Sequence, residues 1–383
     1  MTLRITWDEA SARRMERQFL AVPARAGTPV AEVVGAMLGA HAQVLSAAEV
    51  SVGVRADGVT RADVRAALWE DRSLVKTYGP RGTLHLLPSA ELPLWTAALT
   101  AVPTGPSPFP PDVRLTEAQA DEVVAAIGDA LDGVSLTLDE LGDAVVARTG
   151  PWAGDLVMPA FQEMWPRWRQ VMHRAGRRGA LCFGPNRGRK VTYTRPPRFE
   201  PLGADEGLPL LVRRYLRAYG PARAAHFAKW AAAPQGWAVE LFASLADAGE
   251  IEEVGFEGGP AWVAAGDTEF PGAPVRGVRL LPYFDAYAIG CRPRELLFPG
   301  AAYERALAGG QAGNYPVLLV DGVVAGVWHQ RRQGRRTTVT VEPLRRLTAA
   351  RERELVRQVE RVGEVLEAKA ELVVGKVTAG AHA

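Results

Sequence analysis

Cysteine and histidine are scarce in this sequence. The chain of 383 residues contains two cysteines, Cys182 and Cys291, and six histidines. Two cysteines are too few for a disulfide framework, and no cluster of cysteine and histidine has the spacing of zinc ligands. A phosphate-binding glycine loop and a nucleophile elbow are also missing. These absences predict that no metal and no cofactor is bound, either because the protein is a hydrolase that needs neither or because it has no catalytic activity.

Long apolar runs and a strong excess of one charge are absent as well. No N-terminal apolar segment follows a basic start, and no run is long enough to span a membrane. The formal net charge is only +2, so the molecule as a whole is not a basic surface for nucleic acid. Hydrophobic residues make up 48% and charged residues 23% of the chain, which is typical of globular proteins. We expect a cytoplasmic, nucleoid-associated monomer with no membrane partner.

Patterns of helices followed by a pair of short strands recur three times along the chain. Proline-rich stretches at 101–115 and 195–206 separate them and read as linkers. Helices followed by a hairpin form the pattern of a winged helix, so the sequence predicts a mostly helical α+β protein. The predicted segments are 1–100 with the first such unit, 101–206 with the second, 207–275 with the third, and 276–383 with a β-rich part and a C-terminal helix. In the second segment, Thr116 with Gln119 and Thr137 with Glu140 predict capping boxes, and a tryptophan-rich helix is predicted over 157–175.

Residues 29–55 contain two helical patterns with a break between them. Ser46 and Glu49 predict a capping box at the start of the second helix. The break, Gly39–Gln43, places His41 and Gln43 two residues apart among small residues. One interpretation is a core histidine beside a glutamine that ties down a helix end. The other is water activation, because a neutral imidazole accepts a proton and a glutamine carbonyl holds a water in line with an electrophilic carbon.

Arginine-rich turns are the second group of candidates. Arg81, in the turn Gly79–Gly82, is placed to bind a phosphate near His85, or else is a solvated residue of a hairpin turn. Residues 330–336 form a basic tip between predicted strands at 323–328 and 337–341, which either binds a DNA backbone or protects a strand edge. The candidate DNA-binding residues are Arg81, Arg187, Arg189, Lys190, Arg331, Arg332, Gln333, Arg335 and Arg336. The candidates for lining the site beside His41 and Gln43 are Ser46, His85, Trp328 and His329.

Several short segments of the chain together resemble the AlkZ-like bacterial DNA glycosylases. The matching segments, in order, are Gly39–Gln43, Arg55, Gly79–Leu86, Tyr219–Ala222, Leu281–Tyr287, Arg294–Pro299 and Val320–Trp328. The resemblance runs from about residue 10 to about residue 370, and its specificity lies in the order and spacing of these segments. It implies three tandem winged helices in a C-shaped body with a concave DNA-binding face, and a β-hairpin that engages DNA.

The resemblance also implies a reaction and the residues that perform it. Members of the family carry two catalytic polar residues around one position, commonly Gln-x-Gln or Gln-x-Asp. His41 and Gln43 occupy these positions, and their form is similar to a His-x-Gln branch associated with antibiotic self-resistance in actinobacteria. The expected activity is monofunctional excision of a bulky N7-alkylated guanine from double-stranded DNA, in base excision repair or self-resistance, with interstrand crosslinks as further substrates.

Two other functions are consistent with the residues alone. In a non-catalytic winged-helix regulator, His41 and Gln43 would be structural, and a dimerisation surface with one strongly basic recognition helix would be expected. The basic residues cluster on hairpins instead. In a protein that sequesters a genotoxic small molecule, the free ligand would bind without DNA.

Overall fold

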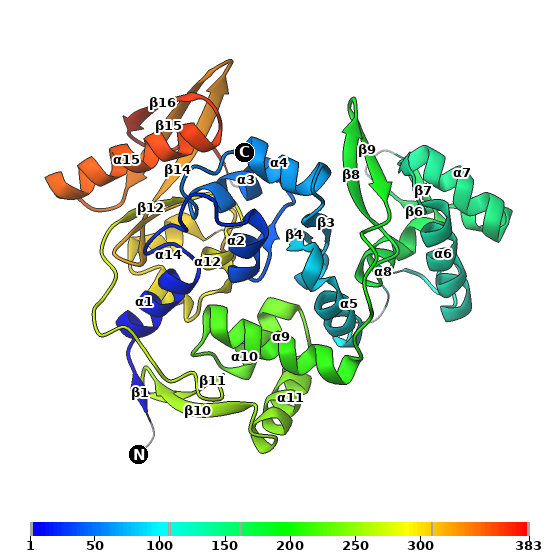
Figure 1. Ribbon diagram of the computed structural model, residues 1–383, viewed down its shortest axis with the longest axis horizontal. Helices are drawn as coiled ribbons and strands as arrows, with labels where there is room; N and C mark the ends of the chain where they lie inside the picture. Colours follow the sequence, from blue (N-terminus) through cyan, green and yellow to red (C-terminus); the bar gives the residue numbers. More distant parts are fainter. Residues whose placement is uncertain (1–2, 106, 108, 161–162, 308, 381–383) are drawn as a thin grey trace. The chain divides into compact units, whose positions relative to one another are not determined.

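The computed structural model describes residues 3–105, 107, 109–160, 163–307 and 309–380, and it divides into two compact units. Unit 1 combines the chain up to Ala67 with the chain from Pro209 onward, and unit 2 is formed by Leu68–Leu208. Helices and strands occur in both units (Figure 1), so the predicted mixture of helix and sheet is confirmed. The unit boundary after Ala67 falls inside the segment 1–100 that the sequence pattern suggested.

Unit 1 starts with β1 (Arg4–Ile5) and α1 (Trp7–Arg17). Thr6 and Glu9 form a capping box at the start of α1, which satisfies backbone N–H groups of the first turn. Arg14 in the middle of α1 is buried and donates hydrogen bonds to the backbone oxygens of Gly220 at 3.3 Å and Pro221 at 2.9 Å. These bonds tie the N-terminal helix to the part of unit 1 that follows Pro209.

Four short elements carry the segment with His41. They are α2 (Val30–Ala36), β2 (Ala40–His41), α3 (Leu45–Gly53) and α4 (Arg61–Trp69). The predicted capping box of Ser46 and Glu49 is wrong, because α3 begins two residues earlier than that box requires and Val44 is its N-cap. Glu49 is instead drawn into the interior, where its carboxylate accepts a hydrogen bond from Arg65 at 2.6 Å.

The rest of unit 1 forms two sheets with helices packed on them. Strands β10 (Ile251–Phe256) and β11 (Gly259–Ala264) pair with β1 in the order β1–β10–β11. A five-stranded sheet has the order β12–β13–β14–β15–β16. Its strands are β12 (Val278–Leu281), β13 (Val317–Val320), β14 (Val323–Gln333), β15 (Arg336–Pro343) and β16 (Lys369–Val374). The helices are α9 (Ala204–Tyr219), α10 (Ala224–Ala231), α11 (Gln235–Asp247), α12 (Ala286–Gly290), α13 (Arg294–Leu297), α14 (Ala301–Ala306) and α15 (Ala349–Val365).

The predicted C-terminal helix is confirmed as α15, which lies along the five-stranded sheet in Figure 1. Its Arg361 is directed at the end of α3 and donates to the backbone oxygens of Gly53 at 2.7 Å and Ala56 at 2.6 Å. A cation at the C-terminal end of a helix satisfies carbonyl groups that have no partner within that helix. The arginine therefore fixes α3, and with it the segment that carries His41, onto α15.

The two strands predicted around the basic tip are present but longer than expected. β14 and β15 pair from Gly326 opposite Pro343 to Gln333 opposite Arg336. Arg331 and Arg332 therefore lie within β14, and only Gly334 and Arg335 form the turn. The continuous run of apolar residues ends at Trp328, but hydrogen bonds between the strands continue beyond the buried part of the sheet, which hydrophobic patterning alone does not reveal.

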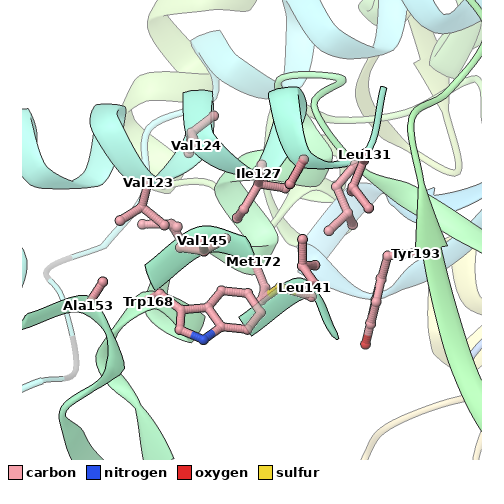
Figure 2. Packing of buried hydrophobic residues seen from close by; sticks show 14 of the residues in the cluster. Val123, Val124, Ile127, Leu131, Leu141, Val145, Ala153, Trp168, Met172 and Tyr193 are labelled. Atoms are coloured by element: carbon pink, nitrogen blue, oxygen red, sulfur yellow. The ribbon is translucent and has the colours of Figure 1, made fainter. Parts of the chain in front are cut away.

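The main sheet of unit 2 is built from two hairpins and one further strand. Strands β3 (Leu74–Tyr78), β4 (Leu84–Pro88), β5 (Ser135–Thr137), β8 (Cys182–Arg187) and β9 (Lys190–Thr194) follow the order β4–β3–β8–β9–β5. Its helices are α5 (Leu92–Ala101), α6 (Glu117–Ala130), α7 (Leu138–Thr149) and α8 (Met172–Arg177). Both predicted capping boxes, at Thr116 and Thr137, are confirmed. Trp168 packs with Ile127, Leu141 and Val145 in the core between α6 and α7 (Figure 2).

The tryptophan-rich helix predicted over 157–175 is wrong. This region forms β6 (Leu156–Pro159), β7 (Met164–Pro166), a short 3₁₀ turn (Arg167–Val171) and then α8. Residues 161 and 162 lie outside the described residues. Pro159 and Pro166 explain the difference, because proline has no N–H to donate and disrupts a helix interior. The spacing of Trp165 and Trp168 reflects a strand end and a turn.

Candidate active site

The segment with His41 leaves α2 through a sharp change of direction. Leu38 and Gly39 both have left-handed backbone conformations, with φ of 58° and 91°. Gly39 closes the helix end by donating to the backbone oxygen of Val34 at 3.0 Å. A left-handed residue after a helix is the usual way to stop it, and glycine adopts that conformation without strain. The chain then enters β2, which consists of Ala40 and His41.

Burial alternates along the four residues from Ala40 to Gln43. Ala40 and Ala42 are fully buried, His41 is 8% exposed and Gln43 is exposed. The two alanines anchor the segment in the core. Of the two polar side chains beside them, the imidazole of His41 is more sheltered than the amide of Gln43.

The imidazole of His41 stacks on the ring of Phe284. The ring centroids are 4.7 Å apart and the planes are inclined by 25°. Phe284 has a left-handed backbone with φ of 56°, and its N–H donates to the backbone oxygen of Gly313 at 3.0 Å. An aromatic residue in this conformation carries backbone strain and needs support from the surrounding structure.

A buried ion pair lies directly beside Phe284 in the sequence. Arg55 donates from its two Nη atoms to the two carboxylate oxygens of Asp285, at 2.7 and 2.8 Å. Both side chains are fully buried, and the hydroxyl of Ser51 donates to the same carboxylate at 2.6 Å. Two parallel hydrogen bonds between guanidinium and carboxylate define the geometry of a pair more tightly than a single contact does.

Tyr219 supports the other side of this segment. Its hydroxyl donates to the backbone oxygen of Met37, the C-cap residue of α2, at 2.6 Å. Burial raises the pKa of the Tyr219 hydroxyl well above its ordinary value, so it stays protonated and remains a donor. The chain just before the break at Gly39 is therefore held by Tyr219 at the end of α9.

The other residues expected to line the site have different environments. Ser46 is exposed in the first turn of α3, and His85 is buried in β4 of unit 2, with Nδ1 3.0 Å from the backbone oxygen of Thr83. Trp328 is 1% exposed and its Nε1 donates to the backbone oxygen of Leu281, so it packs in the core of the sheet. His329 follows it in β14 and is half-buried, and burial lowers the pKa of its imidazole.

The basic tip of unit 1 is fully exposed. Its tip arginines are Arg331, Arg332, Arg335 and Arg336, and Gln333 lies between them. Within the described ranges no carboxylate forms an ion pair with any tip arginine. Arg332 donates to the backbone oxygen of Gly334 at 3.0 Å, which stiffens the turn. The result is a set of cations whose charge is not neutralised by neighbouring carboxylates.

The candidates in unit 2 are in part neutralised. Arg187 donates to Glu140 at 2.7 Å, and Lys190 donates to Asp139 at 2.9 Å. Arg189 is exposed in the turn between β8 and β9. Arg81 occupies the turn between β3 and β4 with a left-handed φ of 59°. Arg187 and Lys190 would have to exchange a carboxylate for a phosphate in order to bind DNA.

The sequence alone suggested no role for Ser51, and Arg55, Phe284 and Asp285 entered only as residues of the segments that carry the resemblance. Arg55 and Asp285 are 230 residues apart in the chain, and no local pattern links them. The signal that could have found them is a charged residue in each of two otherwise apolar segments, since a buried charge requires a partner.

No metal centre accompanies this arrangement among the residues described. Over the described ranges no three His, Cys, Asp or Glu side chains are grouped so that they could hold a metal ion. In that same part of the chain, no helix combines the length and the apolar character needed to cross a membrane.

A family model described as DNA glycosylase AlkZ-like matches residues 34–365, a range that includes His41, Gln43 and the Arg55–Asp285 pair. The chain belongs to this family. An AlkZ-like relative, the interstrand DNA cross-link repair glycosylase of Streptomyces sahachiroi, is 34% identical over 341 residues, which are 85% of this chain and 88% of the relative. The solved structure of the Streptomyces sahachiroi DNA glycosylase AlkZ superposes with a TM-score of 0.77 at 29% identity, covering 97% of this chain and 100% of that one. This AlkZ-like protein is therefore a DNA glycosylase, and its substrate is DNA.

Proposed function

We propose that this glycosylase hydrolyses the N-glycosidic bond of bulky N7-alkylated guanine in double-stranded DNA, and that interstrand crosslinks through N7 are among its substrates. The observation that carries the proposal is the pair His41 and Gln43, which alternate with two buried alanines at the end of β2. A sheltered imidazole beside an exposed amide is suited to hold a water molecule and accept its proton. The relative from Streptomyces sahachiroi, named for cross-link repair, supports the same substrate class.

The chemistry makes modest demands on the protein. Alkylation at N7 gives the guanine a positive charge, so the bond between C1′ and N9 breaks with its electron pair passing to the base and without a strong general acid. The sugar then resembles an oxocarbenium ion. In this proposal Gln43 orients a water toward C1′, the water oxygen bonds to C1′, and His41 takes the proton that the water loses. The products are the free alkylated base and an abasic site.

The same proposal assigns DNA binding to the tip arginines and Gln333, with contributions from Arg81, Arg187, Arg189 and Lys190. Exposed arginines bind phosphates and release counterions, which makes the affinity depend on salt. An open surface suits bulky or crosslinked adducts that do not fit a closed base-flipping pocket. We further propose that the hairpins β3–β4, β8–β9 and β10–β11 belong to three winged-helix units, and that the enzyme acts as a nucleoid-associated monomer in base excision repair or self-resistance.

The test is a base-release assay on duplex DNA with a single bulky N7-alkylguanine. Free base is quantified by mass spectrometry and abasic sites by strand cleavage in alkali, for the wild type, His41→Ala and Gln43→Ala. Val44→Ala is the matched control, because Val44 is the adjacent residue, is 44% exposed and makes no side-chain cap. We expect a loss of about 10²-fold or more in either site variant and wild-type activity in the control.

Two results would contradict the proposal. Base release that survives in both site variants would retain the enzyme and discard this active site. Binding to several N7 adducts without base release by the wild type would discard this substrate class, and a panel of duplexes with adducts at other positions would then identify the excised base.

A further inference from the structure

We propose that Phe284 is a positioning residue for His41, and that the buried Arg55–Asp285 ion pair holds Phe284 in place. This inference rests on the proposed role of His41 in water activation. It extends that role to residues more than 200 positions away in the chain, which do not themselves touch the water or the sugar.

The ring of Phe284 stacks on the imidazole of His41. With centroids 4.7 Å apart and an inclination of 25°, one face of the imidazole is covered by the phenyl ring. A covered face restricts rotation of the imidazole about its χ2 torsion, which is otherwise a broad and soft coordinate. A base that must take a proton from one water in one direction benefits from such restriction, because small errors in placement are costly to catalysis.

Phe284 is held in place through the next residue in the chain, Asp285. The carboxylate of Asp285 accepts two hydrogen bonds from Arg55, one from Ser51 and one from the backbone N–H of Tyr287 at 3.0 Å. The last of these caps α12, so Asp285 also sets where that helix begins. With four donors and no exposure to solvent, the carboxylate leaves the adjoining Phe284 little freedom to move.

Gly313 also packs against Phe284. Gly313 has a left-handed φ of 98°, and a Cβ placed there would lie 3.1 Å from Cδ1 of Phe284 and 3.2 Å from Ile289. The same glycine accepts the backbone hydrogen bond of Phe284. A residue without a side chain leaves full space for the phenyl ring at this point, so Gly313 packs closely against the ring that stacks on His41.

His41 and the side chains that donate to Asp285 all lie in or near one helix, α3. Helix α3 begins four residues after His41, and it carries Ser51 within it while Arg55 follows its end. His41 and the two side chains that donate to Asp285, those of Ser51 and Arg55, are therefore parts of one short stretch of chain. A shift of α3 would move His41 and the anchor of Phe284 together, which preserves the stacked geometry.

The experiment compares Phe284→Leu with Phe284→Tyr in the full-length enzyme. Leucine keeps an apolar side chain and the same backbone strain but removes the aromatic face, whereas tyrosine restores it. Single-turnover excision is measured at increasing enzyme concentration. We expect Phe284→Leu to lower the rate at saturation about 10-fold while the enzyme concentration that gives half the maximal rate stays within about 2-fold, and we expect Phe284→Tyr to recover most of the loss.

A spectroscopic readout makes the test independent of activity. In protein labelled at histidine, the ring protons of His41, assigned by their loss in His41→Gln, are expected upfield because of the ring current of Phe284. This measurement uses the wild type, so it stands even where Phe284→Leu fails to fold. His41 resonances at ordinary positions in the wild type, or a wild-type rate in folded Phe284→Leu, would overturn the inference.

The outcomes separate this inference from the proposed function. If His41→Ala is inactive and Phe284→Leu is fully active, the positioning role fails and the proposed function stands. If His41→Ala keeps full activity, the proposed catalytic role of His41 fails, and the positioning role fails with it even where the rings are stacked.

Discussion

The two basic hairpins of this glycosylase differ in how their charges are compensated. In β14–β15, the tip arginines project from strands that extend beyond the buried sheet, and none forms an ion pair with a described carboxylate. In β8–β9, Arg187 and Lys190 are held by Glu140 and Asp139 from the first turn of α7. The tip arginines can therefore bind a phosphate directly, whereas Arg187 and Lys190 must first give up a carboxylate.

This difference shows that counting basic residues in a sequence overestimates a DNA-binding surface. Exposed ion pairs contribute only about 0–1 kcal/mol, so Arg187 and Lys190 are not locked, but phosphate contacts by them must first replace an existing partner. The uncompensated tip has no such cost. We therefore propose that β14–β15 provides most of the electrostatic affinity for DNA and β8–β9 a minor part.

The largest expected effect comes from neutralising the tip. Replacing the four tip arginines by glutamine should weaken DNA binding about 100-fold near physiological salt and reduce the salt slope of log K by about 3. Fluorescence anisotropy with a labelled duplex over a salt series measures both quantities. The matched control replaces Arg187, Arg189 and Lys190 by glutamine, with an expected loss below about 5-fold. Equal losses in the two variants would contradict the comparison.

A second prediction concerns the acid stability of the unit that carries β8–β9. Burial, aided by Arg177, lowers the pKa of His173 to about 4 from an ordinary value near 6.5. The folded protein therefore keeps this histidine neutral between these values, whereas the unfolded chain binds a proton. Stability is full above about pH 6.5 and is lost as the pH falls toward 4, by about 2 kcal/mol from this group.

Denaturant unfolding at pH 7 and pH 4.5 tests this prediction. The loss of unfolding free energy between the two pH values should be smaller by about 1–2 kcal/mol in His173→Gln than in the wild type. An unchanged loss would assign the acid sensitivity to other groups. The hairpins should be compared above pH 6.5, where this effect is absent.

Releasing the cations of β8–β9 should have a moderate effect in the opposite direction. Asp139→Asn with Glu140→Gln removes both carboxylates, and glutamine preserves the capping box with Thr137. DNA affinity at low salt is expected to rise about 3-fold to 5-fold. Glu122→Gln with Asp129→Asn, on the exposed side of α6, makes the same change in net charge without releasing a cation. An equal gain in this control would mean that net charge, not release, is responsible.

The smallest expected effect is on stability. Arg187→Gln breaks the contact with Glu140, in which both side chains are about half exposed, at 56% and 46%. Such a pair is screened by water and salt, so unfolding free energy should fall by less than about 1 kcal/mol. Thermal unfolding of the variant measures the change, and a loss of several kcal/mol would show that the hairpin depends on this pair.

Local patterns predicted much of this fold. The break at Gly39–Gln43, the hairpins and the capping boxes at Thr116 and Thr137 depend on neighbours within a few residues, and these predictions are confirmed. The box at Ser46 failed because α3 starts at Leu45, so Ser46 lies inside its first turn, and Glu49 pairs instead with Arg65, sixteen residues later. The helix over 157–175 failed because two prolines outweigh the spacing of the tryptophans.

The support of His41 could not be predicted in the same way. Phe284 stacks on His41, and Asp285 forms its ion pair with Arg55. Both contacts join segments more than 200 residues apart, and each segment by itself looks like ordinary core. The separation of paired from uncompensated arginines has the same origin, because Glu140 and Asp139 belong to a helix about 50 residues before the hairpin. Candidate catalytic and DNA-binding residues can be found in a sequence. The contacts that orient them or neutralise their charge depend on the fold.

The most direct test of the account separates binding from chemistry at His41. Single-turnover excision and DNA affinity are measured on the same preparation of His41→Ala, with the four-arginine tip variant beside it. We expect His41→Ala to keep wild-type affinity and to lose about 10²-fold or more in the rate at saturating enzyme, while the tip variant loses affinity. A wild-type rate at saturation in His41→Ala would contradict this expectation.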